Sequence, residues 1–390
     1  MVTRAATTRI GAGVSTSPSA ADAAVEAARE AGRGLGDHDA DLAFLFLSAV
    51  HGELAMEAAH ALREELTPRR LLGCVAEGVL ARGRELERGP AVAVWAGSLP
   101  GASVDVFHIG VRPLEDGVAI EGFPELDDPS LVVLLADPFT FPVSPFLNEL
   151  NERHPRLPLV GGIAAGASRP GSQALIVDDG LYEDGAAGAV LSGVRIRTVV
   201  SQGCAPFGRD AVITSAEGNA VYELAGQPAL ERLREEIASL PPDQRELVTS
   251  GILAGIVIDE NKAEYGRGDF LMRGLIGIDD ESGALLIGEQ VRVGQTLRFH
   301  FRDADSADVD LRESLEAGLA GERSVGALLF TCNGRGSHMF SEPDHDARIV
   351  GDAVGESAVA GFFCGGEIGP VGSRAFLHGF TATAALFLEG

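Results

Sequence analysis

Two stretches near the C-terminus of the 390-residue chain carry side chains that could bind a small polar molecule. Arg335 stands between glycines in Phe330-Thr-Cys-Asn-Gly-Arg-Gly336, and Glu367 follows two glycines in Gly361-Phe-Phe-Cys-Gly-Gly-Glu-Ile-Gly369. Flanking glycines let the backbone approach a ligand closely, and a guanidinium can hold a carboxylate through two parallel hydrogen bonds. Arg335 is therefore a candidate for holding the carboxylate of a zwitterion, and Glu367 for facing its ammonium group.

Both residues also have structural interpretations. Arg335 could be a surface residue of a glycine turn or could pair with Glu367, and Glu367 could cap backbone amides in a Gly-Gly-Glu-Ile-Gly turn. Glu77, in Leu71-Leu-Gly-Cys-Val-Ala-Glu-Gly78, is a weaker N-terminal counterpart of Glu367. The candidate ligand-binding residues are Cys74, Glu77, Cys332, Asn333, Arg335, Cys364 and Glu367.

The cysteines, at positions 74, 204, 332 and 364, offer a second kind of chemistry. If Cys332 or Cys364 were a nucleophile, His338 would be the obvious base, and the chain would be a cysteine-dependent enzyme acting on a small acyl or amino substrate. Free cysteines are, however, often buried as small apolar residues, and reactivity requires a lowered pKa. We assign no catalytic residue and expect four free thiols, with Cys332 and Cys364 the closest pair.

Motifs for metals and cofactors are weak. Asp344-His-Asp346 could be a cluster of metal ligands, but its acidic residues also suit the first turn of a helix, where they interact favourably with the helix dipole. The cysteines do not have zinc spacing. The sequence also lacks a Gly-x-Ser-x-Gly elbow, a phosphate-binding loop and a Gly-x-Gly-x-x-Gly motif after a strand. We therefore predict no metal site and no cofactor.

A repeated β-α-β unit is expected to position the candidate residues. In each of three units, a buried strand and a helix-like segment precede a short apolar run that contains two glycines separated by four residues. A strand that ends in a glycine turn fits all three. A crossover between neighbouring strands of one sheet makes them parallel, so the polar residues that follow the two strands should meet at one edge. The glycines at the start of the three motifs, Gly73, Gly161 and Gly361, should therefore occupy equivalent positions.

The rest of the pattern predicts an α/β protein with mixed sheets flanked by helices. The first strands of the three units are 42–50, 131–136 and 325–331. Segments 91–97 and 103–109 are interpreted as a hairpin, and several later strands follow one another without helices, which favours antiparallel extensions of the sheets. We place one domain at 1–225 and a second at 226–390.

Charge and hydropathy exclude several classes of partner. The net charge is −26 and no basic patch is visible, so a nucleic-acid partner is not expected. No stretch of about 18 uncharged apolar residues occurs, and the N-terminus lacks a leader pattern, so a membrane partner is not expected either. We predict a cytoplasmic protein.

Several motifs resemble those of the FIST family, the F-box and intracellular signal transduction proteins. The resemblance covers nearly the whole chain, with a FIST N part over about 30–225 and a FIST C part over about 226–370. The motifs are Leu71-Leu-Gly-Cys-Val-Ala-Glu-Gly78, Val200-Ser-Gln-Gly-Cys-Ala-Pro-Phe-Gly208 with Glu217-Gly-Asn and Glu223-Leu-Ala-Gly-Gln-Pro-Ala229, and the two C-terminal stretches above.

The resemblance implies a sensory domain that binds a small ligand, with amino acids suggested. Because no F-box, kinase, cyclase or chemoreceptor segment fits beside the two parts, we expect any output to pass through a separate signalling protein. Two alternatives stay open, the cysteine-dependent enzyme and an adaptor that recognises protein. A closed polar pocket would favour the sensor, an exposed hydrophobic groove the adaptor, and a cysteine hydrogen-bonded to a histidine in that pocket the enzyme.

Overall fold

A computed structural model describes residues 7–114, 117–248 and 251–389. These residues form two compact units. Unit 1 contains the described residues up to Val200, the segment Leu311–Leu377 and the residues from Thr381 onward, and unit 2 contains Ser201–Asp310 and His378–Phe380. Unit 1 is thus assembled from both ends of the chain. The division into domains 1–225 and 226–390 follows sequence motifs rather than these units, and it stays a prediction.

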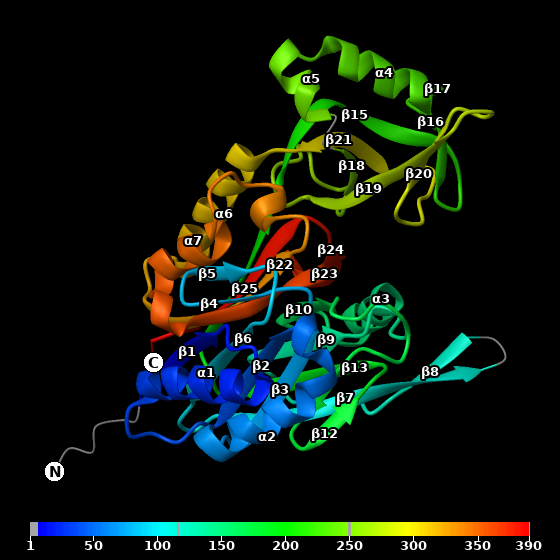
Figure 1. Cartoon of the computed structure of the whole chain (residues 1–390). Coiled ribbons are helices and arrows are strands. Elements are labelled where there is room, and N and C mark those ends of the chain that lie inside the picture. Colours follow the sequence, from blue (N-terminus) through cyan, green and yellow to red (C-terminus); the bar gives the residue numbers. More distant parts are fainter. Residues whose placement is uncertain (1–6, 115–116, 249–250, 390) are drawn as a thin grey trace. The chain divides into compact units, whose positions relative to one another are not determined.

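Unit 1 is built around two stacked sheets (Figure 1). The first has the order β1 (Arg9–Ser15), β6 (Val92–Ser98), β2 (Leu42–Ser48), β3 (Arg70–Ala76), β11 (Leu175–Val177) and β12 (Gly180–Tyr182). The second has the order β14 (Ile196–Gln202), β25 (Thr381–Leu388), β22 (Ser324–Cys332), β23 (Val359–Val371), β10 (Leu159–Ala164), β9 (Leu131–Ala136), β13 (Ala186–Ser192), β7 (Ser103–Leu114) and β8 (Gly117–Glu121). Short strands β4 (Val79–Ala81), β5 (Arg84–Leu86) and β24 (Arg374–His378) branch from the second sheet at β23.

Aromatic side chains fill the space between the two sheets. Phe46 of the first sheet lies 5.2 Å from Phe362 of the second, measured between ring centroids, and Trp95 lies 4.9 Å from Phe387. Side chains alternate between the two faces of a strand, so Phe46 faces this core while its neighbour Leu45 faces the helices. Strands buried on both faces must be apolar at every position, which explains the uninterrupted apolar runs in the sequence.

Helices cover the outer faces of both sheets. α1 (Ala20–Leu35) and α2 (Ala55–Leu66) lie side by side over the first sheet (Figure 1), where an alanine-rich face of α1 packs directly on β1. α3 (Val143–Arg153), α7 (His345–Val354) and the part of α6 (Ala304–Leu319) from Leu311 onward pack on the second sheet. Short 3₁₀ turns, η1 (Ala49–Leu54), η2 (Gly336–His338) and η3 (Glu356–Ala358), precede α2 and flank α7.

The repeated β-α-β unit is confirmed. β2 and β3, β9 and β10, and β22 and β23 are parallel pairs, and the first motif glycines stand opposite leucines at matching positions in all three. A Cβ added at any of these glycines would lie too close to the carbonyl oxygen of the opposite leucine. The three distances are 2.4 Å for Gly73 against Leu45, 1.9 Å for Gly161 against Leu134 and 1.6 Å for Gly361 against Leu329. Glycine is therefore required for the close approach of the two strands.

Two local expectations are wrong. The third motif does not end its strand: β23 continues through Gly365, Gly366 and Glu367 to Val371, because it gains β10 as an antiparallel partner with Gly162 opposite Glu367. The segments 91–97 and 103–109 do not form a hairpin either, because β6 pairs in the first sheet and β7 in the second. A turn signal specifies the reversal of the chain but not the partner of each strand.

Unit 2 is an antiparallel sheet that closes on itself. Its order is β15 (Cys204–Glu217), β21 (Thr296–Arg302), β18 (Ile252–Val257), β19 (Phe270–Asp279), β20 (Ala284–Ile287), β16 (Ala220–Leu224) and β17 (Gln227–Pro228), and β15 also pairs with β16. Helices α4 (Ala229–Ser239) and α5 (Pro242–Val248) belong to this unit, and Leu233 of α4 packs against Phe207 and other core residues of the sheet. The α/β fold class with mixed sheets and flanking helices is confirmed.

Candidate functional site

The end of β22 forms a tight turn that buries Arg335. The Asn333 backbone N–H donates to the Cys364 carbonyl oxygen at 2.9 Å, and the Arg335 N–H donates to the Cys332 carbonyl oxygen at 2.9 Å. These bonds keep the turn against β23, and the Arg335 side chain is 0% exposed. The interpretation of Arg335 as a surface arginine is therefore wrong.

Asp346, at the start of α7, holds the fork of the Arg335 guanidinium. Arg335 Nε donates to Asp346 Oδ2 at 2.7 Å, and Nη2 donates to Oδ1 at 2.8 Å. Asp346 also accepts hydrogen bonds from Thr331 Oγ1 at 2.5 Å and from His345 Nδ1 at 2.9 Å. Burial alone would raise the pKa of Asp346, but the Arg335 charge and the hydrogen bonds outweigh it and hold this pKa below its ordinary value.

Two rings cover the ion pair. The Arg335 guanidinium carbon lies 5.2 Å from the centre of the Phe340 ring, which is within the range of a cation–π contact. Phe340 in turn stacks on His345, with ring centroids 3.4 Å apart and planes 6° from parallel. Phe340 and His345 are both buried. Solvent is therefore kept away from the guanidinium on this side.

Glu367 lies in β23 and is also 0% exposed. Its Oε2 accepts hydrogen bonds from the Thr381 backbone N–H at 3.1 Å and from Thr381 Oγ1 at 2.9 Å. Burial raises the pKa of Glu367 to about 8, although the Thr381 and Cys332 hydrogen bonds and the Arg335 charge act in the opposite direction. Without a bound cation, the side chain is therefore mostly a neutral acid at pH 7.

The cysteines of the site are buried and form no disulfide bond. Cys332 and Cys364 are register partners on the parallel strands β22 and β23, and Cys74 lies in the core between the sheets. Gly162 of β10 leaves room for Cys364, since a Cβ added there would lie 2.3 Å from its Sγ. Burial raises the pKa of both the Cys74 and the Cys364 thiols, so both stay protonated at neutral pH.

Three buried polar atoms at the site make no hydrogen bond within the described ranges of the chain. They are Arg335 Nη1, Glu367 Oε1 and Asn333 Oδ1. The charge of Arg335 acts on Glu367, so these two side chains are neighbours. Buried polar atoms almost always find a partner, and an unpartnered one costs about 1–3 kcal/mol. We call the set of Thr331, Cys332, Asn333, Arg335, His345, Asp346, Cys364, Glu367 and Thr381 the Arg335 cluster.

The hairpin of β4 and β5 fastens the segment that covers the cluster. Glu85 Oε1 accepts a hydrogen bond from the Ala347 N–H at 2.9 Å, and the Glu85 N–H donates to Asp344 Oδ1 at 2.6 Å. Glu87 accepts from the Ser337 N–H at 2.8 Å and from Ser337 Oγ at 2.7 Å. Burial, with the nearby Asp346 charge, raises the pKa of Glu85 to about 8.

Not all the predicted residues come together. Cys332, Arg335, Cys364 and Glu367 do, and the Asn333 side chain is half-buried beside them. Cys74 and Cys364 both lie in the core between the two sheets. A charge on the Cys74 thiol would raise the pKa of Cys364. Glu77 is exposed between β3 and β4, and His338, the expected base, is exposed in η2. Asp344-His-Asp346 begins α7, and no group of three or more metal-ligating side chains occurs among the residues that the structure describes.

Sequence reasoning missed the partners of the predicted residues. Asp346 was named only as a helix-turn or metal residue, although an acidic residue soon after a glycine-flanked arginine is a usable signal for an ion pair. Thr331 is a polar residue in an otherwise apolar strand, which is a second signal. Glu85 and Thr381 carry no local signal, because long-range pairing brings them to the site.

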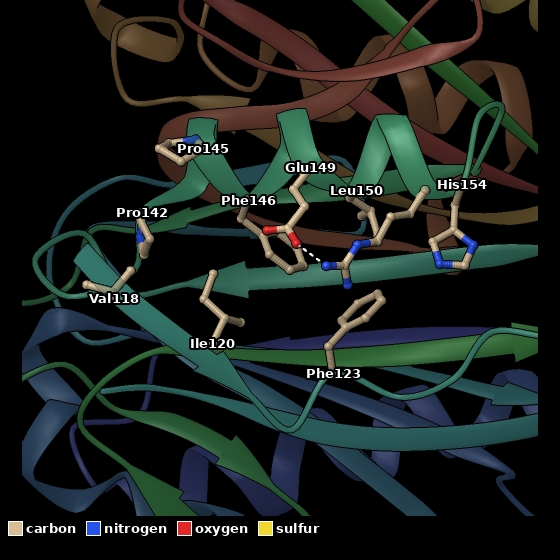
Figure 2. Close-up of a pocket in the computed structure, with 10 residues that line it drawn as sticks. Val118, Ile120, Phe123, Pro142, Pro145, Phe146, Glu149, Leu150 and His154 are labelled. Atoms are coloured by element: carbon tan, nitrogen blue, oxygen red, sulfur yellow. Dashed lines mark ion pairs between the residues drawn. The ribbon is translucent and has the colours of Figure 1, made fainter. Parts of the chain in front are cut away.

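A separate groove of unit 1 lies between β8 and α3 (Figure 2). Its volume is about 460 Å³, and Ile120, Phe123 and Phe146 give it apolar walls. Glu149 and Arg153, one turn apart on α3, form an ion pair at its rim. β8 is the last strand of its sheet, so its outer edge is unpaired by any described strand. The groove thus places apolar walls beside an unpaired strand edge.

Known proteins match the chain over nearly its full length. Residues 41–227 match the family model of the FIST N domain, and residues 229–370 match that of the FIST C domain. The chain is 44% identical over 385 residues to "Uncharacterized protein Rv0628c" of Mycobacterium tuberculosis (strain ATCC 25618 / H37Rv), covering 98% of this chain and 100% of the relative. It is 43% identical over 385 residues to "Uncharacterized protein Mb0898c" of Mycobacterium bovis (strain ATCC BAA-935 / AF2122/97), covering 98% and 99%. Within the described residues, no helix is both long and apolar enough to span a membrane.

Proposed function

The chain belongs to the FIST family, whose domains act in signal transduction, and from this premise we propose that it is a cytoplasmic sensor of a small zwitterion such as an amino acid. The proposed site is the Arg335 cluster. One observation carries the proposal, the unpartnered Arg335 Nη1, Glu367 Oε1 and Asn333 Oδ1. The lack of a disulfide among the four cysteines suits a reducing cytoplasm.

The unpartnered atoms complement an amino acid. Arg335 Nη1 is a charged donor and suits a carboxylate, while Glu367 Oε1 and Asn333 Oδ1 are acceptors and suit an ammonium group. Because Asp346 already occupies the fork of Arg335, the ligand carboxylate would bind through Nη1 rather than through two parallel bonds. The expected pair of parallel hydrogen bonds is thus reduced to one, but the Arg335 charge still pairs with the ligand carboxylate.

Binding in a buried cluster requires the covering segment to move. Phe340 covers the guanidinium, and Glu85 and Glu87 fasten the segment on which it lies. A ligand that replaces internal contacts of the cluster changes the stability of that segment, and this is how binding would be transmitted to a separate signalling protein.

Calorimetry with matched small molecules tests the proposal. We expect at least one amino acid to bind the wild type, and its decarboxylated amine and its deaminated acid to bind at least tenfold more weakly, since each lacks one charged group. Glu367→Gln should weaken binding of the amino acid by a similar factor. Arg348→Lys, on the surface of the same α7, is the control and should leave affinity unchanged.

The pH dependence sharpens the test. A bound ammonium favours ionised Glu367, whose pKa is about 8 in the free protein, so affinity should rise as the pH increases from 6 to 8 and a proton should be released on binding. An affinity that is flat over this range in the wild type would place the ammonium elsewhere. Turnover of the ligand that stops in Cys332→Ser would replace the sensor with the cysteine-dependent enzyme.

The protein-recognition adaptor is a second candidate because of the groove between β8 and α3. An extended apolar peptide could pair with the free edge of β8 and place side chains against Phe123 and Phe146. Val118→Lys, on β8, should then abolish binding of a signalling protein that co-purifies with the wild type, while leaving amino-acid affinity unchanged.

A further inference from the structure

Unit 2 contains a small cavity that is separate from the Arg335 cluster. Its volume is about 150 Å³. All its lining residues belong to unit 2, and they come from the end of β14, the start of β15, the loop before β19, the first residue of β19, β21 and the middle of α6. The lining residues are Gln202, Cys204, Pro206, Gly266, Arg267, Phe270, Arg298, His300 and Asp310.

His300 offers the cavity a hydrogen-bond acceptor. Its side chain is 3% exposed, and its Nδ1 lies 3.1 Å from the Arg298 carbonyl oxygen. A carbonyl oxygen only accepts, so Nδ1 carries the proton of this contact. Burial lowers the pKa of His300 to about 4, so the ring is neutral at pH 7 and Nε2 keeps its lone pair. Within the described part of the chain, Nε2 makes no hydrogen bond.

Gln202 offers a second acceptor. It is 7% exposed, and its Nε2 donates to the Phe270 carbonyl oxygen at 2.8 Å, which fixes the orientation of the amide. Its Oε1 makes no hydrogen bond with any residue that the structure describes. Two neutral acceptors therefore remain available on residues that are more than nine-tenths buried.

The same cavity also has cationic walls. Asp210 holds Arg298 through Nε at 2.5 Å and Nη2 at 2.6 Å, which leaves Nη1 outside that ion pair. The Arg267 guanidinium lies 3.8 Å from Asp310, and its side chain is half exposed. Phe270 and Pro206 contribute apolar surface. The cavity therefore combines two ion-paired arginines, the Asp310 carboxylate, neutral acceptors and a small apolar wall.

We propose that this cavity binds a small 2-hydroxy carboxylate. The arginines would receive the carboxylate, and the hydroxyl would donate to His300 Nε2 or Gln202 Oε1. Neutral acceptors suit a hydroxyl better than an ammonium group, whose charge is best matched by a carboxylate. A cavity of similar volume in another protein holds benzene, so the ligand has about six heavy atoms. L-lactate meets these conditions.

Ligand-observed NMR titration of the full chain tests the site with L-lactate and propionate, which differ only by the hydroxyl. We expect lactate to bind and propionate to bind about three- to tenfold more weakly, the effect of one hydrogen bond between neutral groups. No binding of lactate at about 100 mM, or equal affinities for the two acids, would overturn the proposal.

Variants locate the binding. His300→Gln should weaken lactate binding to the level of propionate, whereas His154→Gln, beside the groove of unit 1, is the matched control and should have no effect. If His300→Gln does not fold, the comparison of lactate with propionate on the wild type still decides. Glu367→Gln should leave lactate affinity unchanged, so failure of this site and failure of the Arg335 cluster as a site are separately visible.

Discussion

The first and third repeat units contain the same residue types in a similar order and use them differently. Cys74 and Glu77 follow the first motif glycine, and Cys364 and Glu367 follow the third. β3 ends at Ala76, so Glu77 is exposed, whereas β23 continues along β10 and buries Glu367. A second strand partner thus decides whether a glutamate is a solvated surface charge or a buried acid with a pKa of about 8.

The largest difference between the units should come from the buried ion pair, which the third unit alone supplies to the proposed site. Asp346→Asn leaves the Arg335 charge buried without a carboxylate, and we expect it to lower the free energy of unfolding by about 3–5 kcal/mol. Glu342→Gln, which breaks the exposed pair with Arg348, should cost less than about 1 kcal/mol. Urea denaturation measures both, and equal costs would show that the buried pair is not special.

The next largest loss of stability is expected from substitution of the motif glycines. A Cβ at Gly361 would lie 1.6 Å from the Leu329 carbonyl oxygen, against 2.4 Å for Gly73 and Leu45. We expect Gly361→Ala to destabilise unit 1 by about 3 kcal/mol and Gly73→Ala by about 1–2 kcal/mol. Gly110→Ala is the control, because nothing lies within 4 Å of its added Cβ. Thermal denaturation measures both losses. A larger loss for Gly73→Ala than for Gly361→Ala would contradict the explanation from these close contacts.

The two glutamates should differ in how they make stability depend on pH. Between pH 4.5 and about 8, folded Glu367 holds a proton that the unfolded chain has released, so its contribution makes stability fall as the pH rises through this window. Glu367→Gln should remove about 1 kcal/mol per pH unit from this slope. Glu77→Gln, the same substitution at an exposed position of the first unit, is the control. Glu85 also has a pKa of about 8, so part of the dependence of stability on pH should remain in both variants.

The smallest effect concerns the thiols. In denaturant we expect four equivalents to react with a thiol reagent, and in the native state Cys74 and Cys364 should be protected, because both are fully buried and protonated. Mass spectrometry of the labelled peptides gives the labelling rate of each cysteine. Fast native labelling of Cys364 would mean that the third unit opens far more readily than its packing indicates.

Local signals in the sequence predicted the strands, the parallel pairs and the glycine positions. A buried strand needs an unbroken apolar run, and a close approach needs glycine, so both leave a mark within a few residues. No local signal predicts the strand that pairs with β23 beyond Cys364. That strand is β10, which lies about 200 residues away along the chain, and its pairing with β23 depends on the whole sheet. The same holds for β6 and β7, and for the closed sheet of unit 2.

The candidate site was predicted in the same uneven way. Arg335, Glu367 and the two cysteines were found because glycines flank them and because strands of one unit end together. The contact between Arg335 and Asp346 could not be assigned, because sequence does not show where α7 places its first turn. Burial of both charged residues is a tertiary property, and no local signal in the sequence indicates it.

The discontinuity of unit 1 has a consequence for synthesis of the protein on the ribosome. The second sheet places β22, β23 and β25, all after residue 323, between β14 and β10, which are made much earlier. When unit 2 has just emerged, the inner face of the first sheet, including Phe46 and Trp95, still lacks Phe362 and Phe387. Unit 1 can therefore complete its core only after termination, while unit 2, which except for its short C-terminal piece is one continuous segment, can fold during translation. Nascent chains should thus need chaperones on their N-terminal segment until the C-terminal strands of unit 1 have been made.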